Sequence, residues 1–261
     1  MRGRFIFLGT GASLGVPVIG CKCSVCSSDH PHNRRLRPSA LIEMGSQTFL
    51  IDAGPDFRQQ ALIHKIEHLD GILFTHAHYD HTAGIDDLRP IYFPRKDPLP
   101  VLLSKETENE LLLRFRYIFM SQKGNKETFV ERIKLQTLQN LDGEEFFEGI
   151  RIQYITFFQG SMQVNGYRIG NFAYISDIRN YEEKIFDHLQ GVTHLVVSAL
   201  RFTPTPLHFS IDEAIAFAKR VGAQHVWLTH LSHDLDYEKT NAYLPEFVRL
   251  GYDGLTFDFS I

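Results

Sequence analysis

The segment ILFTHAHYDH, residues 72–81, constrains the fold of this chain more than any other part of its sequence. Its short apolar start is typical of a buried strand. Four residues of metal-ligand type follow within six positions: His76, His78, Asp80 and His81. They cannot all face one side of a strand, so a loop at the strand end must wrap them around a centre. In such a loop the first two histidines can bind one ion, while the aspartate and the last histidine bind a second. The alternative interpretation is a polar turn that happens to be rich in histidine.

The composition is compatible with a globular protein that binds metal ions. The chain has 261 residues, of which 43% are apolar, and this is enough to fill one large core. We therefore expect a single domain over residues 1–261. The formal net charge of -4 does not favour a nucleic-acid partner. Thirteen histidines is a high number, and because imidazole is the commonest transition-metal ligand, the excess favours metal or proton chemistry.

The sequence also indicates the cellular compartment in which the protein is found. An apolar run at residues 5–8 faintly resembles a leader, but GTG interrupts it, whereas a secretory signal needs about 7 to 15 apolar residues. No stretch approaches the roughly 18 apolar residues of a membrane span. The three cysteines, Cys21, Cys23 and Cys26, are odd in number and lie within six residues, which makes a poor disulfide framework. We therefore expect a cytoplasmic protein with no membrane partner.

Short apolar strands recur along the chain and alternate in part with amphipathic helices. The pattern predicts strands over residues 4–8, 40–44, 48–51, 71–74, 172–175, 194–198 and 225–228. It predicts helices over residues 57–66, 104–119 and 210–222. The last helix should begin with a capping box of Ser210 and Glu213 and end at Gly222.

The connections indicate how these elements assemble. Residues 45–47 join the second and third predicted strands as a hairpin, and the polar residues 123–126 predict a loop. Hairpins first, followed by strands that alternate with helices, predict mixed sheets covered by helices.

The H-x-H-x-D-H string, preceded by LIDAGPDF with Asp52, is similar to the signature of the metallo-β-lactamase superfamily. The resemblance implies an α/β (α+β) fold, an αββα sandwich of two mixed sheets flanked by helices, with the metals at one edge. It implies that Asp177, in FAYISD, bridges both metals, and that His230, in VWLTH, binds the second. The alternatives are a turn-forming aspartate and a satisfied core histidine. We count Asp80 among the catalytic residues as well as among the ligands.

Further segments look like the PhnP-type cyclic phosphodiesterases and their relatives: FLGTGASLGVPVIGCKCSVC, NRRLRPSALI, PDFRQQ, GYRIGNFAYISD, HFSIDEA and WLTHLSH. They are spread over nearly the whole chain. The resemblance implies hydrolysis of a small cyclic phosphodiester, such as phosphoribosyl 1,2-cyclic phosphate, to an open phosphomonoester. Two active-site divalent metals, manganese or zinc, would activate a hydroxide, because such ions lower the pKa of bound water to about 7 and neutralise phosphoryl charge.

His208 lies just before the predicted helix at 210–222 and matches a family histidine that is not a metal ligand. It could bind the phosphoryl group of the substrate or protonate the leaving oxygen. Either role suits a side chain whose ordinary pKa is about 6.5. The alternative is an inert histidine beside a helix cap.

The cysteine cluster predicts a structural zinc, because three thiolates can occupy three corners of a tetrahedral site. His30 and His32 are local candidates for the fourth ligand, and the resemblance nominates His233. We prefer His233, because the site would then tie the N-terminal loop to the C-terminal active-site strand. Three reduced thiols without a metal are the alternative.

One position departs from the family pattern. The family places another first-metal histidine ahead of the GYRIGNFAY strand, and here the matching residue is Gln159. No histidine occurs between His81 and His188 to replace it. The first metal would keep three protein ligands and the second four, so we expect partial occupancy of the first site.

Three hypotheses for the function follow. The leading one is a small-molecule cyclic phosphodiesterase. A tRNase Z-like nuclease shares the metal motif, but the acidic net charge and the lack of an obvious basic arm argue against it. A non-catalytic ligand-binding or carrier protein of the same fold, like the cofactor-synthesis relatives that share the cysteine pattern, is favoured by Gln159. A homodimer is compatible with all three.

Overall fold

Two mixed sheets face each other in the computed structural model, which describes residues 2–119 and 132–261. The first sheet contains, in spatial order, β14 (Thr256–Ser260), β1 (Arg2–Gly9), β2 (Ser39–Met44), β3 (Gln47–Ile51), β4 (Gly71–Leu73), β5 (Leu99–Ser104) and β6 (Ile133–Leu138). The second contains β13 (Val248–Leu250), β12 (His225–Thr229), β11 (His194–Ser198), β10 (Phe172–Ile175), β9 (Met162–Ile169), β8 (Ile150–Gln159) and β7 (Asp142–Phe147). Strands β3 to β6 and β10 to β13 run parallel, and the other pairs are antiparallel.

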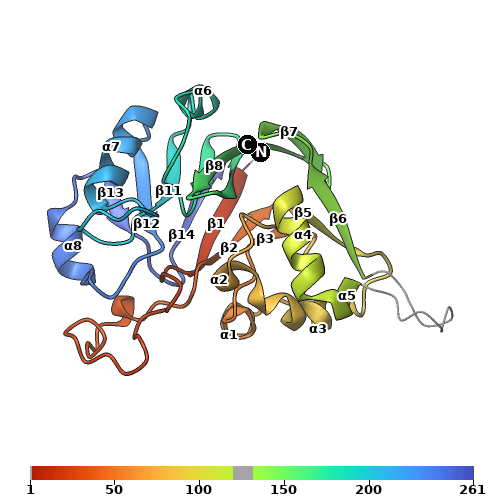
Figure 1. Cartoon of the computed structure of the whole chain (residues 1–261), viewed down its shortest axis with the longest axis horizontal. Coiled ribbons are helices and arrows are strands. Elements are labelled where there is room, and N and C mark those ends of the chain that lie inside the picture. The colour runs from red at the N-terminus through yellow and green to blue at the C-terminus, as the bar shows by residue number, and fades with distance from the viewer. Residues whose placement is uncertain (1, 120–131) are drawn as a thin grey trace.

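Helices cover the outer face of each sheet (Figure 1). On the side of the first sheet lie α1 (Phe57–His64), α2 (Tyr79–Thr82), α3 (Arg89–Tyr92), α4 (Lys105–Arg114), α5 (Arg116–Phe119) and the 3-10 turn η2 (Ala83–Leu88). On the side of the second lie α6 (Ile185–His188), α7 (Ile211–Val221) and α8 (Tyr237–Tyr243). A further 3-10 turn, η1, spans Pro31–Asn33. No helix in the described ranges is long and apolar enough to cross a bilayer. Two facing sheets, each covered by helices on its outer face, confirm the predicted αββα sandwich.

The buried side chains follow the same layers. On β11, Val196 packs between the two sheets, whereas its neighbours Leu195 and Val197 face the helices of the second sheet. Successive side chains of a strand point to opposite faces, so a strand between two cores is apolar on both. This is why β11 is a continuous apolar run.

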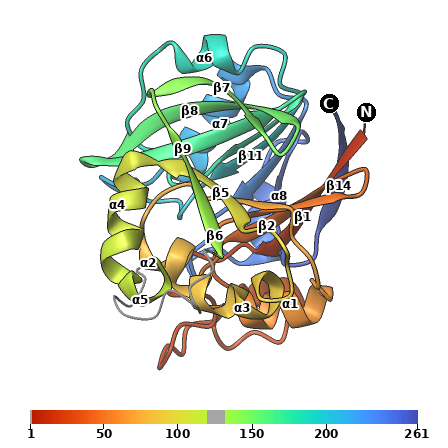
Figure 2. The same cartoon turned by 90° about the vertical axis from the view of Figure 1, so that its right-hand side faces the viewer.

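The first and last strands are neighbours. Arg2 of β1 pairs with Ser260 of β14, so the two ends of the chain lie side by side in both views (Figures 1 and 2). The strands that precede the candidate ligands lie further along each sheet. There, parallel strands end at a common edge.

Several predicted elements are confirmed, including the strands at 172–175 and 194–198. The capping box of Ser210 and Glu213 is present, and α7 ends at Gly222 in the left-handed conformation. The single helix over 104–119 is wrong, because the helix ends at Arg114. There Phe115 leaves the helical region, and it packs with Ile118 and Phe119 against the core of the first sheet. The loop at 123–126 lies outside the described residues.

Candidate metal centre

The candidate ligands gather where parallel strands end. His76 follows β4, Asp177 follows β10 and His230 follows β12, while Asp52 follows β3. Three of these residues, Asp52, Asp177 and His230, have positive φ values of 59°, 56° and 59°. Such backbone is uncommon for residues other than glycine, and it is concentrated at functional sites. The chain therefore turns sharply at two predicted ligands, Asp177 and His230, and at Asp52.

The four candidate ligands at residues 76–81 lie in two kinds of local structure. His76 lies outside any helix or strand, His78 caps the start of helix α2, and Asp80 and His81 lie in the helix itself. The rings of His76 and His81 are nevertheless neighbours, with centroids 4.1 Å apart, and both residues group with Asp177. The loop therefore brings members of both predicted pairs into one cluster.

A complete four-ligand group forms around Asp80, His81, Asp177 and His230. The Nε2 atom of His81 lies 3.5 Å from an oxygen of Asp80 and 3.3 Å from one of Asp177. The Nε2 atom of His230 lies 3.4 Å and 3.3 Å from oxygens of the same two carboxylates. A tetrahedral ion bound at 2.0–2.1 Å separates its nitrogen and oxygen ligands by about 3.3–3.4 Å. The group therefore fits a divalent metal in spacing, burial and ligand type.

The other metal position is less complete. The Nε2 atom of His76 lies 3.0 Å from Nδ1 of His78, and His76 also groups with Asp177. Gln159 is buried beside them, and its Nε2 atom donates to Oδ1 of Asp177 over 3.2 Å. An amide nitrogen is not a metal ligand, so this position has three protein ligands as the side chains lie here.

Asp52 and Thr75 orient the histidines from outside the centre. Asp52 is fully buried and accepts hydrogen bonds from the backbone and the hydroxyl of Thr75. Its Oδ2 atom also lies 2.7 Å from Nδ1 of His81, and the Thr75 hydroxyl lies 2.9 Å from Nδ1 of His76. Such contacts turn the opposite ring nitrogen toward a metal. Sequence reasoning noted Asp52 only as part of a motif and missed Thr75; their positions at strand ends beside the ligand string were the available signal.

The electrostatics of the centre suit a cation. Burial works against every charge here, yet the neighbouring histidines hold the pKa of Asp80 and of Asp177 below the ordinary value. Burial also opposes protonation of His81, but Asp80, Asp52 and Asp177 outweigh it and raise its pKa. Burial lowers the pKa of His76. Ionised carboxylates and a neutral imidazole such as that of His76 are the forms that bind metals, whereas the raised pKa of His81 means that this residue would release a proton when an ion binds.

His208 lies at the rim of this centre. Its ring stacks on that of His230 at 4.8 Å, and its Nδ1 atom is 3.4 Å from Oδ1 of Asp177. Gln159 approaches both ring nitrogens at 3.2 Å. The side chain of His208 is 16% exposed, compared with 1–2% for Asp177 and His230. His208 is therefore the more accessible group, although it also lies close enough to Asp177 and His230 to form a ligand cluster with them.

The cysteine cluster converges on His233. The three sulfur atoms lie 3.3, 3.6 and 3.5 Å from Nδ1 of His233, in the order Cys21, Cys23 and Cys26. Zinc bonds of about 2.3 Å to sulfur and 2.0–2.1 Å to nitrogen imply a separation of about 3.5 Å in a tetrahedron. A backbone hydrogen bond from Cys26 lowers the pKa of Cys23 to about 6, which favours its thiolate. The group therefore fits zinc.

The local alternatives for the fourth ligand are engaged elsewhere. His30 bonds Glu238 and stacks on Tyr237, and His32 stacks on Tyr252 at 3.9 Å. The structure thus brings His233, and neither His30 nor His32, to the three cysteines.

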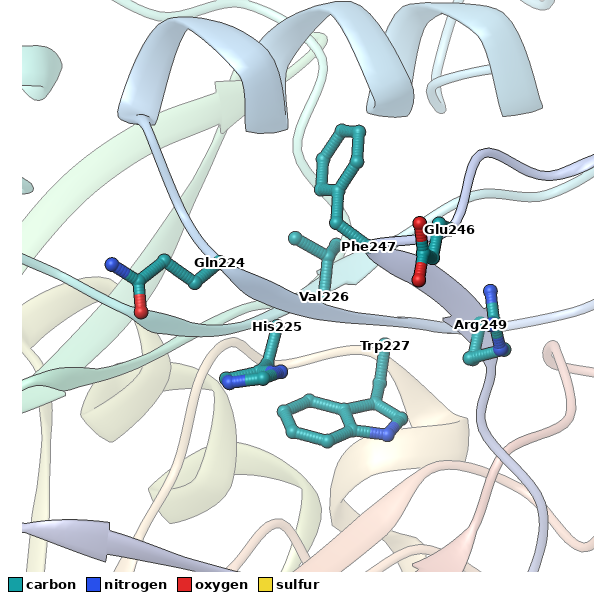
Figure 3. Close-up of a pocket in the computed structure, with 7 residues that line it drawn as sticks. All are labelled: Gln224, His225, Val226, Trp227, Glu246, Phe247 and Arg249. Atoms are coloured by element: carbon teal, nitrogen blue, oxygen red, sulfur yellow. The ribbon is translucent and has the colours of Figure 1, made fainter.

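A separate cavity of about 540 Å³ lies at the opposite end of strands β12 and β13 from the candidate ligands. It is lined by residues at the starts of β12 and β13 (Figure 3), whereas His230 follows the end of β12. Figure 3 shows His225 and Trp227 on one side of β12 and Phe247 on the other. This cavity is not part of the metal centre.

Comparisons with known proteins agree with the fold. The family model for the beta-lactamase superfamily domain matches residues 47–231. This range contains every residue of the active-site group and most of both sheets. The chain therefore belongs to the metallo-β-lactamase superfamily.

A solved structure indicates which family within the superfamily the chain belongs to. A diphosphatase from the PhnP family is 38% identical, covers 99% of this chain and 98% of its own, and superposes with a TM-score of 0.90. The chain is thus a member of the PhnP family. Zn²⁺-bound PqqB from Methylobacterium extorquens shares the fold, with a TM-score of 0.78 and 19% identity over 98% of this chain and 100% of its own.

A curated relative is longer than this chain. An octanoyltransferase of Porphyromonas gingivalis is 34% identical over 97% of this chain and 51% of its own length. The chain therefore spans about half of that relative.

Proposed function

We propose that this chain is a metal-dependent phosphodiesterase that hydrolyses a small cyclic phosphodiester of the phosphoribosyl 1,2-cyclic phosphate type. The observation that carries the proposal is the four-ligand group, in which His81 and His230 each contact both carboxylates, with the accessible His208 at its rim. The high identity to a PhnP-family diphosphatase supports hydrolysis at phosphorus.

We assign the residues to three ions. Zinc or manganese would be held by the four-ligand group, and a second such ion by His76, His78 and Asp177. A structural zinc would be held by the cysteines and His233. When bound, the two active-site ions supply Lewis acidity to the phosphoryl oxygens and lower the pKa of the attacking water.

His208 would act on the substrate. Burial lowers its pKa to about 4, so the free imidazole is neutral at pH 7. An anionic phosphodiester beside it would raise this pKa, because a nearby negative charge favours the protonated form. His208 could then donate a proton to the departing alkoxide oxygen. Gln159 and Asp177 hold the ring in place for this transfer.

A substrate panel tests the proposal. The purified chain, supplied with zinc or manganese, is assayed on a cyclic sugar phosphodiester, a chromogenic linear phosphodiester and an inorganic diphosphate. We expect the cyclic diester to be preferred, and His230→Ala to abolish turnover. His225→Ala is the matched control, because His225 is an exposed histidine on the same strand. A preference for diphosphate, or no turnover of any phosphoester, would contradict the assignment.

The same panel separates the competing functions. Full metal content without turnover would favour a carrier protein, the hypothesis that Gln159 supports. Cleavage of a tRNA 3' end in preference to small diesters would favour the nuclease. An octanoyl thioester in the panel tests whether the half shared with the P. gingivalis relative acts on that bond.

A further inference from the structure

A row of small polar side chains crosses the second sheet directly beneath the metal centre. Ser198 on β11 is the register partner of Thr229 on β12. Continuing the register of β10 with β11 and with β9 places Ser176 and Asn165 in the same row. The row thus runs from Thr229 through Ser198 and Ser176 to Asn165, across four adjacent strands.

The row points into the space between the two sheets. Two positions before Thr229, Ser198 and Ser176 are Trp227, Val196 and Tyr174, and two positions after Asn165 on the antiparallel strand β9 is Tyr167; all four pack in the core between the sheets. Side chains two apart on a strand share a face, so the polar row continues this inner face toward the metal edge. All four of its members are fully buried.

Most polar atoms of this row lack a protein partner. Within the described ranges, both side-chain polar atoms of Asn165 and the hydroxyls of Ser198 and Thr229 make no hydrogen bond. Ser176 differs, because its hydroxyl donates to Asp177. Buried polar groups in proteins are almost always hydrogen-bonded, and ordered water commonly supplies the missing partner. Four such atoms in one row therefore point to water as the ligand.

The row also adjoins the ligands themselves. Thr229 directly precedes His230, and Ser176 directly precedes Asp177. The backbone N–H of Asn165 donates to the carbonyl of Thr75, which precedes His76. The row thus adjoins the chain segments that carry His230, Asp177 and His76.

One ligand lacks an outer partner. The Nδ1 atoms of His76 and His81 contact Thr75 and Asp52, but Nδ1 of His230 is buried and has no hydrogen-bond partner in the described part of the chain. A metal-binding histidine nearly always donates its other N–H, to a carboxylate, a carbonyl or water. We propose that Asn165, Ser198 and Thr229 hold buried water beneath the metal centre, and that this water accepts the Nδ1–H of His230.

This inference rests on the assignment of His230 as a metal ligand, and it makes the row a set of positioning residues. Water held by the hydroxyls fixes the rotation of the imidazole, and thereby keeps Nε2 directed at the ion. Loss of such an outer partner typically weakens metal binding by about 10- to 100-fold.

Thr229→Val tests the inference, because valine keeps the shape of threonine and removes only the hydroxyl. If the hydroxyl binds water, the variant should melt at a lower temperature and bind zinc about 10- to 100-fold more weakly in competition with a chelating dye. If the hydroxyl is unpaired, its removal relieves a desolvation cost, so the melting temperature should rise. A higher melting temperature, or unchanged zinc affinity, would overturn the inference.

Two further variants complete the experiment. Thr107→Val is the control, because Thr107 is buried on α4 and its hydroxyl accepts from Ser104. It should lower the melting temperature and leave zinc affinity unchanged. Ser198→Ala is a milder change in the row and replaces Thr229→Val if that variant does not fold. It should likewise lower the melting temperature and weaken zinc binding. If the unmodified protein binds no zinc at His230, the metal assignment is refuted. The sign of the change in melting temperature would still show whether the row holds water.

Discussion

Replacing Gln159 by histidine probes a predicted ligand position where this chain departs from the pattern of the family that it resembles. In the structure the Gln159 amide donates to Asp177 over 3.2 Å, so its nitrogen and not its oxygen faces the centre. The position served by His76 and His78 then has Asp177 as its third protein ligand. A histidine at 159 would add an imidazole, which binds zinc and similar ions better than a neutral amide oxygen does.

The expected gain can be bounded. Outer partners of metal ligands, which never touch the ion, change metal affinity by about 10- to 100-fold. A direct ligand should matter at least as much, so Gln159→His should tighten the first site by at least about 1.4–2.7 kcal/mol. Loss of the Gln159 hydrogen bond should also raise the metal affinity, because Asp177 can then bind the ion without first giving up that bond.

The assay combines metal stoichiometry with kcat under matched metal buffering. We expect the unmodified protein to lose one active-site ion at limiting metal, and Gln159→His to retain both and turn over faster. Gln163→His is the control, because it adds a histidine to the neighbouring strand β9 outside the ligand group. The reasoning is refuted if the unmodified protein already holds two tightly bound active-site ions and the histidine variant is no faster.

Three further predictions concern other residues. Cys23→Ser should remove about one zinc per chain and lower the melting temperature, since three thiolates suit a closed structural site; unchanged metal content on elemental analysis would refute this. His208→Ala should reduce kcat by about 10²- to 10⁴-fold with metal content unchanged, and metal loss as large as in His230→Ala would show that His208 is a ligand. Asp52→Asn should weaken active-site metal binding by about 10- to 100-fold in chelator competition, because His81 loses its carboxylate partner; equal affinity would contradict this role for Asp52.

Local interactions explain which elements the sequence could predict. The strand at 172–175 is a continuous apolar run, and the helix that follows Ser210 carries its own cap in Glu213, so both are encoded within a few residues. The break at Phe115 is different, because it depends on aromatic side chains reaching a core built by distant strands. Strands β5 to β8, β13 and β14 were missed. Strand β5 is itself a largely apolar run, whereas the polar residues of β6 and β7 leave no such local pattern.

The sequence alone determined the kinds of candidate ligand and their close spacing at residues 76–81, because ligand type and spacing are local properties. Only the tertiary structure decided how distant groups meet them. Asp80 and His230 are 150 residues apart, yet they lie 3.4 Å from each other. The direction of the Gln159 amide was decided in the same way, and so was the contact of His233, which the sequence already favoured, with the three cysteines. Hydrogen bonding and packing across separate strands select these contacts, and the two sheets must assemble before the contacts exist.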